Sequence, residues 1–483
     1  MENTAITTKE SVAHEIVPIK EKLSFAFTNT GQTMIYGLFS MLMLYMTDYL
    51  GIDAAIAGLI ITLTRIFDAI NDPIMGQIVD RTKSRWGKCR PYMLFTPIPV
   101  ALAAIAMFAP IGLTGAKAIP YAVIIYLIFT MIYTANDIPY WSMSSVITTD
   151  PKQRTSIVTL TRLIGSLGTG ICVGGFWFVN KFFINYAGAS FHNGFFFSAI
   201  VFCVIGAALM MQGFFFTKER AKSEVAQEKF FENIKLIPKS KPLVLLLIAG
   251  ALYSVMAVGM TALTTYFVKW NVKEIFPNMS SVDIMSIYTP VIGFLPAIAT
   301  VVGLLVTPFL IKKLEKRTIL IASCSFGAIV NIASYFIGYS NIYLFIALRF
   351  FAFLPVGIWT SMTTILIGDN VDYLEYKTGK RVEGTCFSLL TFMGKFQNSI
   401  SVAITGLVLS IVGYNGALNP DVTNQTPKAL NGIFIMVTLI SGLGYVLAMI
   451  PFLFYKLDKK THLLMVEENM RRKALLEEST TAE

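Results

Sequence analysis

A cluster of charged residues interrupts an apolar stretch of the sequence at TRIFDAINDPIMG. Arg65, Asp68 and Asp72 recur at i, i+3 and i+7, a spacing that puts them on one face of a helix. Two carboxylates one turn apart repel each other unless a positive charge lies between them. A hard cation would provide that charge, with Asn71 as a neutral oxygen ligand. The alternative is a buried salt bridge between Arg65 and Asp68, which leaves Asp72 unpaired. The spacing therefore favours a site for Na⁺, Li⁺ or H⁺.

A second set of polar residues lies in YTANDIPYW, where Tyr133, Asp137 and Trp141 recur at i, i+4 and i+8. This spacing again describes one helical face. A carboxylate can accept hydrogen bonds from two neighbouring hydroxyls of a sugar, and an indole can stack on the C–H face of a pyranose. Aromatic stripes more often face lipid or pack in a core, but the acid within this one favours a sugar-binding platform.

Two basic residues, Arg162 and Lys395, also lie within apolar stretches. Such charges cost about 2.5–3.5 kcal/mol on insertion scales, so they persist where they pair or act on a ligand. Each of the two could partner Asp137, the acids at 68 and 72, or a substrate. Lys395 is the only ionisable group in its apolar stretch, which predicts that it faces a central cavity. An interhelical salt bridge is compatible with that placement.

The loop DRTKSRWGKCRP carries five basic residues within eleven positions. Such a loop can serve only to anchor the protein on the cytoplasmic side. A sharper hypothesis is a charge-locked cytoplasmic gate that pairs with acids of DNVDYLEYKTGKR and has two discrete arrangements. The predicted gate residues are Arg65, Asp80, Arg81, Arg85, Arg90, Asp369, Asp372, Glu375 and Arg381.

The elements that must position these residues are helices that span a membrane. The chain of 483 residues is 55% hydrophobic and only 14% charged, whereas soluble proteins average about 25% charged residues. Apolar stretches of about 20 residues recur along almost the whole chain, and they are continuous rather than alternating, as helical spans are. We predict twelve spans, at 23–51, 53–79, 91–110, 118–147, 155–183, 191–216, 242–270, 284–311, 318–338, 341–368, 384–413 and 431–456.

The positions of lysine and arginine predict the orientation of these spans. Most of the 39 basic residues fall in the tails, the central linker and alternate loops, and short basic loops stay in the cytoplasm. We therefore predict a multi-pass protein of the cell (cytoplasmic or inner) membrane with both termini cytoplasmic. The predicted divisions are a tail at 1–22, six helices in 23–216, a cytoplasmic linker at 217–241, six helices in 242–456 and a tail at 457–483. Two such halves are typical of secondary transporters, with the site between them.

Motifs for other classes of protein are missing. The sequence contains no HExxH, GxSxG or GxxxxGK[ST] pattern, so we expect neither an enzyme nor direct drive by ATP. The net charge of +10 is spread over short loops, which argues against nucleic acid as a partner. The expected partners are a small sugar or glycoside, a monovalent cation and membrane lipid, with no cofactor beyond the coupling ion.

Three separated motifs resemble those of the glycoside–pentoside–hexuronide:cation symporters of the major facilitator superfamily, in particular the melibiose permease type. They are RIFDAINDPIMGQIVDRTKSRWGKCRPY, NDIPYWS and DNVDYLEYKTGKR, and the resemblance covers about residues 22–456. It implies an all-α integral membrane protein with twelve transmembrane helices in two six-helix bundles and alternating access. The implied cation site is Asp68, Asn71, Asp72 and Thr134, with Na⁺ favoured and H⁺ as the alternative. The implied sugar site is Tyr133, Asp137, Trp141, Arg162, Trp359, Thr391 and Lys395.

One position departs from the pattern. The melibiose permease type has a Lys–Asp pair in its first helix, where this sequence has Gln32 and Thr33 at the sugar site. Without that acid the pocket is less negative beside Arg162 and Lys395, so we expect a substrate with its own carboxylate, such as a hexuronide. Two alternatives remain: a cation-coupled lysolipid or amphiphile transporter of the same superfamily, and a membrane sensor or enzyme, which the lack of a sizeable soluble domain disfavours.

Overall fold

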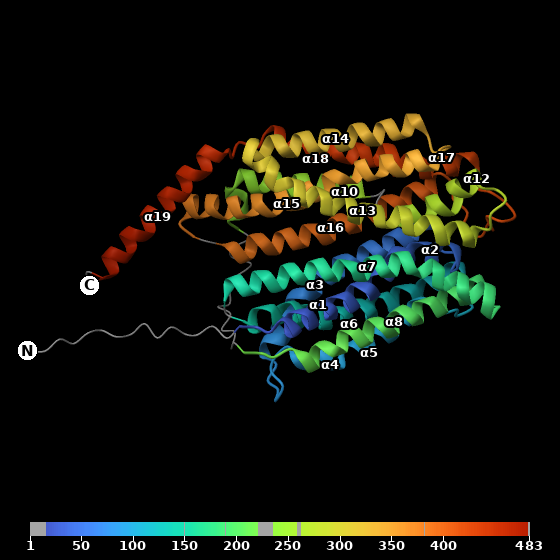
Figure 1. Cartoon of the computed structure of the whole chain (residues 1–483), viewed down its shortest axis with the longest axis horizontal. Helices are drawn as coiled ribbons and strands as arrows, with labels where there is room; N and C mark the ends of the chain where they lie inside the picture. The colour runs from blue at the N-terminus through green and yellow to red at the C-terminus, as the bar shows by residue number, and fades with distance from the viewer. Residues whose placement is uncertain are drawn as a thin grey trace, which may run out of the picture.

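The computed structural model describes residues 16–148, 150–188, 190–220, 235–257, 262–380 and 382–481. Within these ranges the regular structure is helical, and no strand is present. Figure 1 shows two groups of helices side by side, one from residues 19–216 and one from residues 241–453. We call them the first and the second bundle. The all-helical architecture expected from the sequence is confirmed.

The first bundle follows the chain through helices that alternate in direction. Its elements are α1 (Ile19–Gly37), η1 (Leu38–Met41), α2 (Leu42–Asp48), α3 (Ala54–Arg81), α4 (Arg90–Phe95), α5 (Pro97–Met107), η2 (Gly115–Ala118), α6 (Ile119–Val146), α7 (Pro151–Ala187) and α8 (Phe191–Phe216). The segments α1, η1 and α2 follow one another without a loop.

The second bundle repeats this arrangement with more breaks in its helices. Its elements are η3 (Ile237–Lys239), α10 (Lys241–Ala257), α11 (Ala262–Phe267), η4 (Val268–Val272), α12 (Lys273–Ile275), α13 (Ser281–Lys313), α14 (Lys316–Ile337), α15 (Ile342–Thr378), α16 (Glu383–Ile411), α17 (Pro427–Ile435), η5 (Met436–Ile440) and α18 (Ser441–Leu453). A final helix, α19 (Lys459–Thr481), extends away from it (Figure 1).

Different helices lie at the two ends of the molecule. The start of α1 and the whole of α19 lie at one end, on the left in Figure 1, which we call the terminal face. Helices α2, α12 and α17 lie at the other end, which we call the opposite face. Helix α3 therefore runs from the opposite face to the terminal face, and α16 runs the other way.

Eight helices of the described residues are long and apolar enough to cross a membrane, and two shorter apolar helices accompany them. The eight lie in α3, α6, α7, α8, α13, α14, α15 and the α17–α18 segment, and the two shorter ones are α5 and α10. The predicted spans 23–51 and 384–413 are helical but are not among these ten. Both carry polar side chains, such as Gln32 and Lys395, and both line the cavity described below.

Helix α1 lies unusually close to α7 because two glycines on α7 leave room for it. A Cβ atom added to Gly165 would lie 1.9 Å from Asn29 Oδ1, and one added to Gly168 would lie 2.1 Å from the carbonyl oxygen of Thr30. The Thr33 hydroxyl donates to the Gly165 carbonyl at 2.6 Å. Small residues at helix interfaces permit this close approach in membranes. The contact fixes the rotation of α1 and so determines which of its side chains face the centre.

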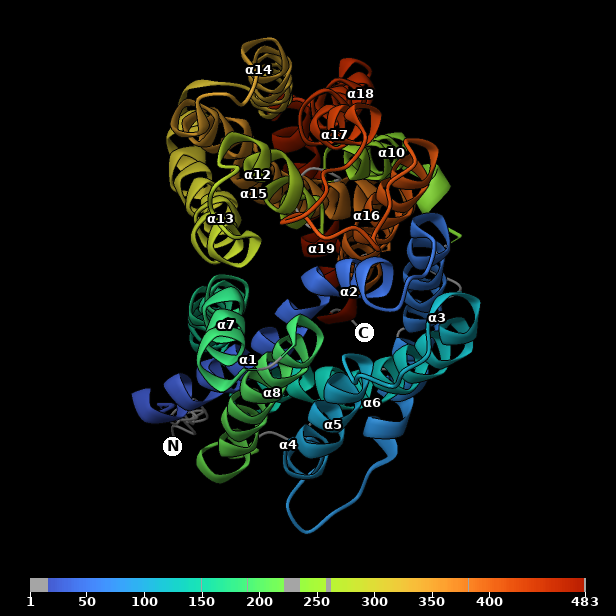
Figure 2. The same ribbon diagram turned by 90° about the vertical axis from the view of Figure 1, so that its right-hand side faces the viewer.

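Contacts between the two bundles lie towards the opposite face. The hydroxyl of Thr62 on α3 donates to the carbonyl of Ser399 on α16 at 3.0 Å. Lys181, near the end of α7, pairs with Asp283 in the first turn of α13 at 2.7 Å. Figure 2, which looks onto the opposite face, shows α2 between the two bundles. In this conformation the bundles therefore meet over the half of the molecule nearest the opposite face.

Candidate functional site

The ammonium group of Lys395 on α16 joins the two bundles at the centre of the molecule. It donates to Asp68 Oδ2 at 3.1 Å and also to Asp72 Oδ2. Both acids lie on α3, separated by one helical turn. Of the partners that the sequence left open for Lys395, the structure shows these two carboxylates. The positive charge required between the acids is in this conformation a side chain of the second bundle.

The two carboxylates differ in how far their oxygens are satisfied. Asp68 is buried, and its Oδ1 accepts a hydrogen bond from the hydroxyl of Thr134 on α6 at 2.8 Å. Asp72 Oδ1 is buried and accepts no hydrogen bond from a described residue. The described residues contain no group of three or more His, Cys, Asp or Glu residues that could hold a metal ion. Two carboxylates and one hydroxyl are nonetheless a donor set that suits a hard monovalent cation.

Asp68, Thr134 and Lys395 border a cavity of about 380 Å³ between the bundles, and Asp72 is not among its lining residues. The cavity has a size typical of sites for small molecules. Most of its wall comes from α1, α3, α6 and α7 of the first bundle, and Lys395 is its contribution from the second. The lining residues are Asn29, Gln32, Thr33, Tyr36, Arg65, Asp68, Tyr133, Thr134, Asp137, Trp141, Arg162, Ser166 and Lys395. The structure thus brings together most of the residues singled out by the sequence, although they lie far apart along the chain.

Helix α1 reaches the acid of α6 through a chain of amide groups. The side-chain amide of Asn29 donates to Gln32 Oε1 at 3.1 Å, and the amide of Gln32 donates to Asp137 Oδ1 at 2.8 Å. Gln32 is almost completely buried. Thr33 lines the cavity, but its hydroxyl is bonded to the backbone of α7. Gln32 therefore holds Asp137 in place, while Thr33 mainly ties α1 to α7.

The aromatic residues of α6 form one edge of the cavity. The guanidinium carbon of Arg162 lies 5.4 Å from the centroid of the Trp141 ring, within the range of a cation–π contact. The ring of Tyr133 stacks on Phe129, with centroids 5.4 Å apart, and lies 5.6 Å from the ring of Tyr36. Arg162 is exposed and Trp141 is half-buried. A planar cation and an indole therefore lie next to each other with room for a ligand.

Arg65 does not form the salt bridge that the spacing on α3 allowed. It donates to the hydroxyl of Tyr36, and its guanidinium carbon lies 4.9 Å and 5.7 Å from the ring centroids of Tyr36 and Phe39. No ion pair between Arg65 and Asp68 is present among the described residues. The rotation of α3 turns Arg65 towards α1 and Asp68 towards Lys395. Arg65 therefore lines the cavity and does not lie in the basic loop where the predicted gate was centred.

Three further residues predicted to bind the cation or the sugar are not among those that line the cavity, and the structure does not describe the side chain of one of them. Trp359 is 5% exposed and stacks on Tyr253 with ring centroids 4.1 Å apart, so it packs in the second bundle and is absent from the cavity wall. Its helix presents that face to α10 in this conformation, and the role of Trp359 at the sugar site stays a prediction. Asn71 is half-buried and is not among the lining residues. The side chain of Thr391 lies outside the described residues.

The acids of the predicted gate have other partners in this conformation. Asp369 pairs with Lys316 on α14 at 2.5 Å and lies 3.6 Å from His462 Nε2, which is 3.1 Å from Asp372 Oδ2. Glu375 is buried at the end of α15. For Asp369 and Asp372, the described partners therefore belong to α14 and α19 and not to the basic loop. The reason is that the bundles meet at the opposite face, whereas this gate belongs to the terminal face.

The basic loop packs instead within the first bundle. The carboxylate of Glu219 accepts backbone N–H groups of Lys88, Cys89 and Arg90 at 2.7–3.0 Å. The Arg90 guanidinium donates to the Phe214 carbonyl at 2.8 Å.

Of the remaining gate residues, only Arg81 and Arg85 have described side chains, and neither pairs with a described residue of the second bundle. The guanidinium of Arg85 lies over the ring of Trp86 at 4.3 Å, and Arg81 is exposed. The side chain of Asp80 and the whole of Arg381 lie outside the described residues. The gate remains a prediction for a different conformation.

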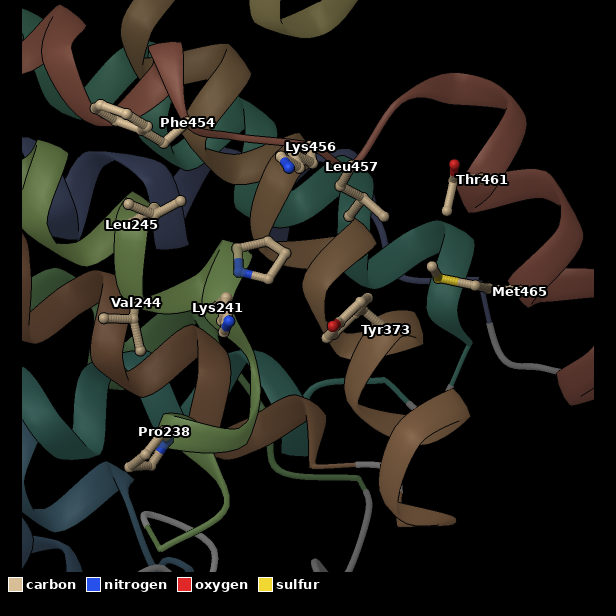
Figure 3. Close-up of a pocket in the computed structure, with 11 residues that line it drawn as sticks. Pro238, Lys241, Val244, Leu245, Tyr373, Phe454, Lys456, Leu457, Thr461 and Met465 are labelled. Atoms are coloured by element: carbon tan, nitrogen blue, oxygen red, sulfur yellow. The ribbon is translucent and has the colours of Figure 1, made fainter.

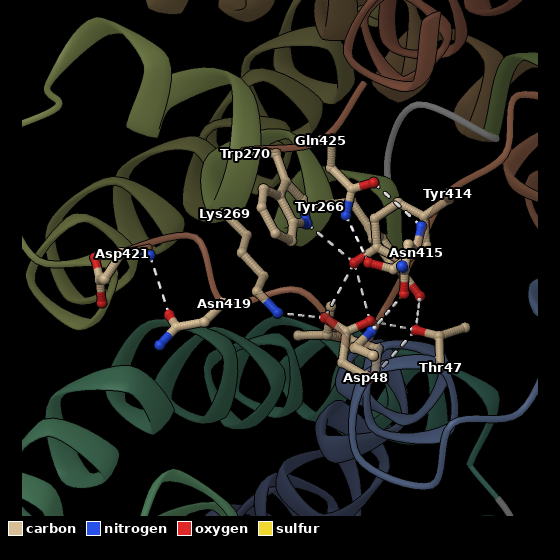
Figure 4. A network of polar contacts seen from close by, with 12 residues as sticks. Thr47, Asp48, Tyr266, Lys269, Trp270, Tyr414, Asn415, Asn419, Asp421 and Gln425 are labelled. Carbon is tan, nitrogen blue, oxygen red and sulfur yellow. Dashed lines mark hydrogen bonds and ion pairs between the residues drawn. The ribbon is translucent and has the colours of Figure 1, made fainter. Parts of the chain in front are cut away.

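A network that the sequence did not reveal joins the bundles at the opposite face (Figure 4). Lys269 pairs with Asp48, which also accepts the hydroxyl of Tyr414 at 2.9 and 3.0 Å. The hydroxyl of Thr47 donates to Asp48 at 2.7 Å and lies 2.8 Å from that of Tyr266. We call these five residues the opposite-face latch. They lie near the ends of apolar stretches, where polar and aromatic residues commonly mark the membrane–water interface, so nothing in the sequence indicates that they contact one another.

The cavity also contains residues that the sequence did not single out, namely Asn29, Tyr36 and Ser166. Asn29 and Tyr36 lie on α1, three and four positions from Gln32 and Thr33, which is the spacing of one helical face. That periodicity was the available signal for both of them. Ser166 is next to Gly165 on α7, and nothing in its sequence context distinguished it.

Comparison with known proteins finds sugar transport proteins and symporters along almost the whole chain. Residues 24–459 match the protein family described as MFS/sugar transport protein. The chain is 31% identical over 463 residues to the uncharacterized symporter YnaJ of Bacillus subtilis (strain 168), covering 94% of this chain and 95% of the relative. It is 28% identical over 469 residues to the isoprimeverose transporter of Lactiplantibacillus pentosus, covering 95% and 93% of the two chains. It is also 28% identical over 442 residues to the glucuronide carrier protein homolog of Escherichia coli (strain K12), covering 89% and 91%.

Solved structures share the fold at much lower identity. The nucleoside transporter NupG superposes with a TM-score of 0.62 at 15% identity, covering 90% of this chain and 99% of that chain. A bacterial homolog of the human lysosomal transporter Spinster, in its inward-facing and unoccupied conformation, gives a TM-score of 0.62 at 14% identity, covering 92% and 97%. These similarities concern the fold alone.

Proposed function

Since this chain belongs to the family of MFS/sugar transport proteins, the glycoside–pentoside–hexuronide:cation symporters, we propose that it carries a glycoside, pentoside or hexuronide across the membrane together with Na⁺ or H⁺. Its family and relatives are multi-pass membrane transporters of the major facilitator superfamily and not enzymes. The geometry of the site bears on which cation is bound, on which substrate is bound and on the side to which the cavity opens.

One observation carries the coupling proposal: a single ammonium group serves two carboxylates. Lys395 bonds to Asp68 and Asp72, and the buried Oδ1 of Asp72 accepts no hydrogen bond from the residues that the structure describes. A buried acceptor without a partner is costly, and a cation at the two acids would satisfy it. Thr134 already lies at Asp68 and would add a hydroxyl ligand. Na⁺ or H⁺ therefore competes with Lys395 for these acids.

This competition supplies a physical route for coupling. When a cation replaces Lys395 at Asp68 and Asp72, the ammonium is released at the edge of the cavity that it already lines. There it can bind an anionic or hydroxyl group of the substrate. The cation thus raises substrate affinity, and by linkage the substrate raises cation affinity by the same factor.

The cavity supports a substrate that carries both a sugar ring and a carboxylate. Trp141 offers a face for the ring, and Arg162 next to it is a planar, permanent cation suited to a carboxylate. Asp137 is already engaged by Gln32, so it repels an anionic substrate less than a free acid would. Among the relatives, one is a glucuronide carrier protein homolog and another an isoprimeverose transporter. Within the proposed class we therefore favour a hexuronide.

We propose that the terminal face is cytoplasmic and that the protein lies in the cell membrane with both termini inside, as the distribution of basic residues predicts. The opposite-face latch then closes the external side, and the cavity of this conformation communicates with the cytoplasm. Alternating access requires the latch to break and the terminal face to close. The gate predicted between the basic loop and Asp369 or Asp372 would form in that second conformation.

The decisive experiment is uptake into proteoliposomes of a small panel of galactosides, xylosides and glucuronides, each with a sodium gradient, a proton gradient or neither. Sodium-driven accumulation of a glucuronide is the expected result. Accumulation driven only by protons would retain the site and replace the cation. No accumulation of any glycoside under either gradient would refute the proposal and favour the amphiphile transporter.

A further inference from the structure

A second cavity of about 620 Å³ lies at the terminal face of the second bundle, apart from the central site. Figure 3 shows its lining, which comes from η3, the start of α10, the last turns of α15, the segment 454–457 that follows α18, and the first turns of α19. Val244, Leu245, Leu457 and Met465 give it an apolar wall. None of its lining residues belongs to the proposed transport site, so the transport proposal leaves this cavity unexplained.

The cavity lies where the spans of the second bundle end. Helix α10 begins at Lys241, and α18 ends at Leu453. Leu453 and Phe454 are 47% and 65% exposed, although both are large and apolar. Such side chains at the end of a span face lipid hydrocarbon. The mouth of the cavity is therefore at the boundary between the acyl chains and the headgroups.

Two lysines at this boundary carry charges without partners. Lys241 and Lys456 both line the cavity and both are exposed. Neither ammonium forms an ion pair or a hydrogen bond with another described residue. The described acids nearby have other partners: Asp369 pairs with Lys316 at 2.5 Å, Asp372 lies 3.1 Å from His462, and Asp458 accepts the backbone N–H of Thr461 at 2.8 Å. Two lysines without an ion pair among the described residues thus accompany an apolar wall.

We propose that this cavity binds the headgroup phosphate of an anionic phospholipid from the leaflet at the terminal face. Lys241 and Lys456 face the phosphate, and Val244, Leu245 and Phe454 contact the start of its acyl chains. Lysines near a membrane surface attract anionic lipids. A soluble phosphate ion would gain nothing from the apolar wall, which is why the lipid is the better occupant.

Bound lipid would also link α19 to the body of the second bundle. Helix α19 is held to α15 by Asn469, which donates to the Asp372 carbonyl at 3.0 Å, and by Arg472, which donates to the Tyr376 carbonyl at 2.9 Å. Its Thr461 and Met465 form one side of the cavity, opposite α10. A lipid in the cavity therefore contacts α10, α18 and α19 together, and should protect α19 from proteolysis.

The test is native mass spectrometry of the purified full chain with either phosphatidylglycerol or phosphatidylcholine. The wild type should retain phosphatidylglycerol preferentially, and the double variant Lys241→Gln/Lys456→Gln should lose on the order of tenfold in that preference. The matched control is Lys312→Gln/Lys313→Gln, which removes two exposed lysines from the end of α13 at the same face, outside the cavity. The control should behave as the wild type does.

An arginine variant and a competition with inorganic phosphate complete the test. Lys241→Arg/Lys456→Arg should retain phosphatidylglycerol, which separates loss of charge from damage to the fold. Inorganic phosphate should not displace the lipid; displacement at low phosphate concentration would identify a soluble-anion site and overturn the proposal. Equal phosphatidylglycerol retention by the wild type and the double glutamine variant would overturn it as well.

Discussion

Two lysines of the second bundle each reach acids of the first bundle, and they do so in different surroundings. In the opposite-face latch, Lys269 and Asp48 are 8% and 2% exposed. At the central site Lys395 is 24% exposed, and its partners Asp68 and Asp72 are 9% and 22% exposed. The first pair is dry and the second is partly open to water.

The more buried acid, Asp48, also accepts more hydrogen bonds from described residues than Asp72 does. Asp48 accepts hydrogen bonds from Tyr414 and Thr47 in addition to its lysine. Asp72 has one buried oxygen that no described residue hydrogen-bonds. A complete, dry network favours one conformation of the protein, whereas an incomplete, wetter one can exchange its cation. Under the proposed function, the first contact closes the transporter and the second couples it to its cation.

The largest expected effect comes from Asp72→Asn, which removes the acid with the free oxygen. Cation-driven accumulation in proteoliposomes should fall by roughly 100-fold, the scale of losing one partner of a buried charged group. The control is Asp53→Asn, an exposed acid at the start of the same helix, which should leave uptake nearly unchanged. Unaltered sodium-driven uptake by Asp72→Asn would remove this acid from the coupling site.

Breaking the latch should change the conformation more than the chemistry. Lys269→Gln leaves Asp48 without its cation, so the conformation closed at the opposite face should lose stability, and the open one should rise roughly 30-fold in population. The readout is labelling by a membrane-impermeant maleimide of a cysteine placed at Ser399, which is buried between α3 and α16. The native cysteines are all buried.

The control for the latch is another ion pair between the bundles at the same face. Lys181 and Asp283 are 36% and 37% exposed, so Lys181→Gln should alter labelling by less than about fivefold, as for an ordinary surface pair. Equal labelling of the Lys269→Gln and Lys181→Gln proteins would mean that the latch does not hold the bundles together.

The two lysines can also be compared by the response of the protein to sodium. In Lys395→Gln the acids lose their resident cation, so the sodium concentration for half-maximal thermal stabilisation should fall by about tenfold. Lys269→Gln should show no such change, because Tyr414 and Thr47 still satisfy Asp48. A scan of thermal unfolding in sodium and choline chloride measures both. An identical sodium response in the wild type and Lys395→Gln would refute the competition.

The smallest effect concerns a loop at the opposite face, outside the spans. Burial alone would raise the pKa of Asp421, but hydrogen bonds from Ser281 and Lys273 outweigh it and hold the pKa below its ordinary value. A depressed pKa in the folded state means that the stabilisation is present above about pH 4 and is lost as the pH falls below it. Asp421→Asn should lower Tm by on the order of 1 °C at neutral pH. That difference should vanish in acid; a constant difference at every pH would contradict the assignment.

Much of the fold follows from the sequence because length, polarity and loop charge act locally. Continuous apolar stretches predict helices wherever they occur, and the boundaries of α3, α6 and α8 differ from the expected spans by only a few residues. The spacing of Asp68 and Asp72 places both on one face, and the structure turns that face to Lys395. Residues that share one helix are therefore related correctly by periodicity alone.

Relations between helices are harder to predict because lipid and protein core are equally apolar. The stretch of α15 that ends at Trp359, FAFLPVGIW, is apolar on every side and so does not reveal its rotation; in the structure Trp359 stacks on Tyr253. The partners Asp48 and Lys269 are 221 positions apart in sequence, and nothing local to either one indicates the other. The conformation adopted by the bundles adds a further degree of freedom, which decides whether the latch or the predicted gate is formed.

The distance along the sequence between Lys395 and its acids matters while the chain is being synthesised. Asp72 precedes Lys395 by 323 residues. At ordinary rates of synthesis the ribosome needs on the order of tens of seconds to cover that distance. During this interval α3 is already made, and α16 does not yet exist. During that interval the two acids need another source of positive charge, protons or a dissolved cation, unless the entry of α3 into the bilayer is delayed. Assembly of the protein therefore depends on how these acids are neutralised before Lys395 is made.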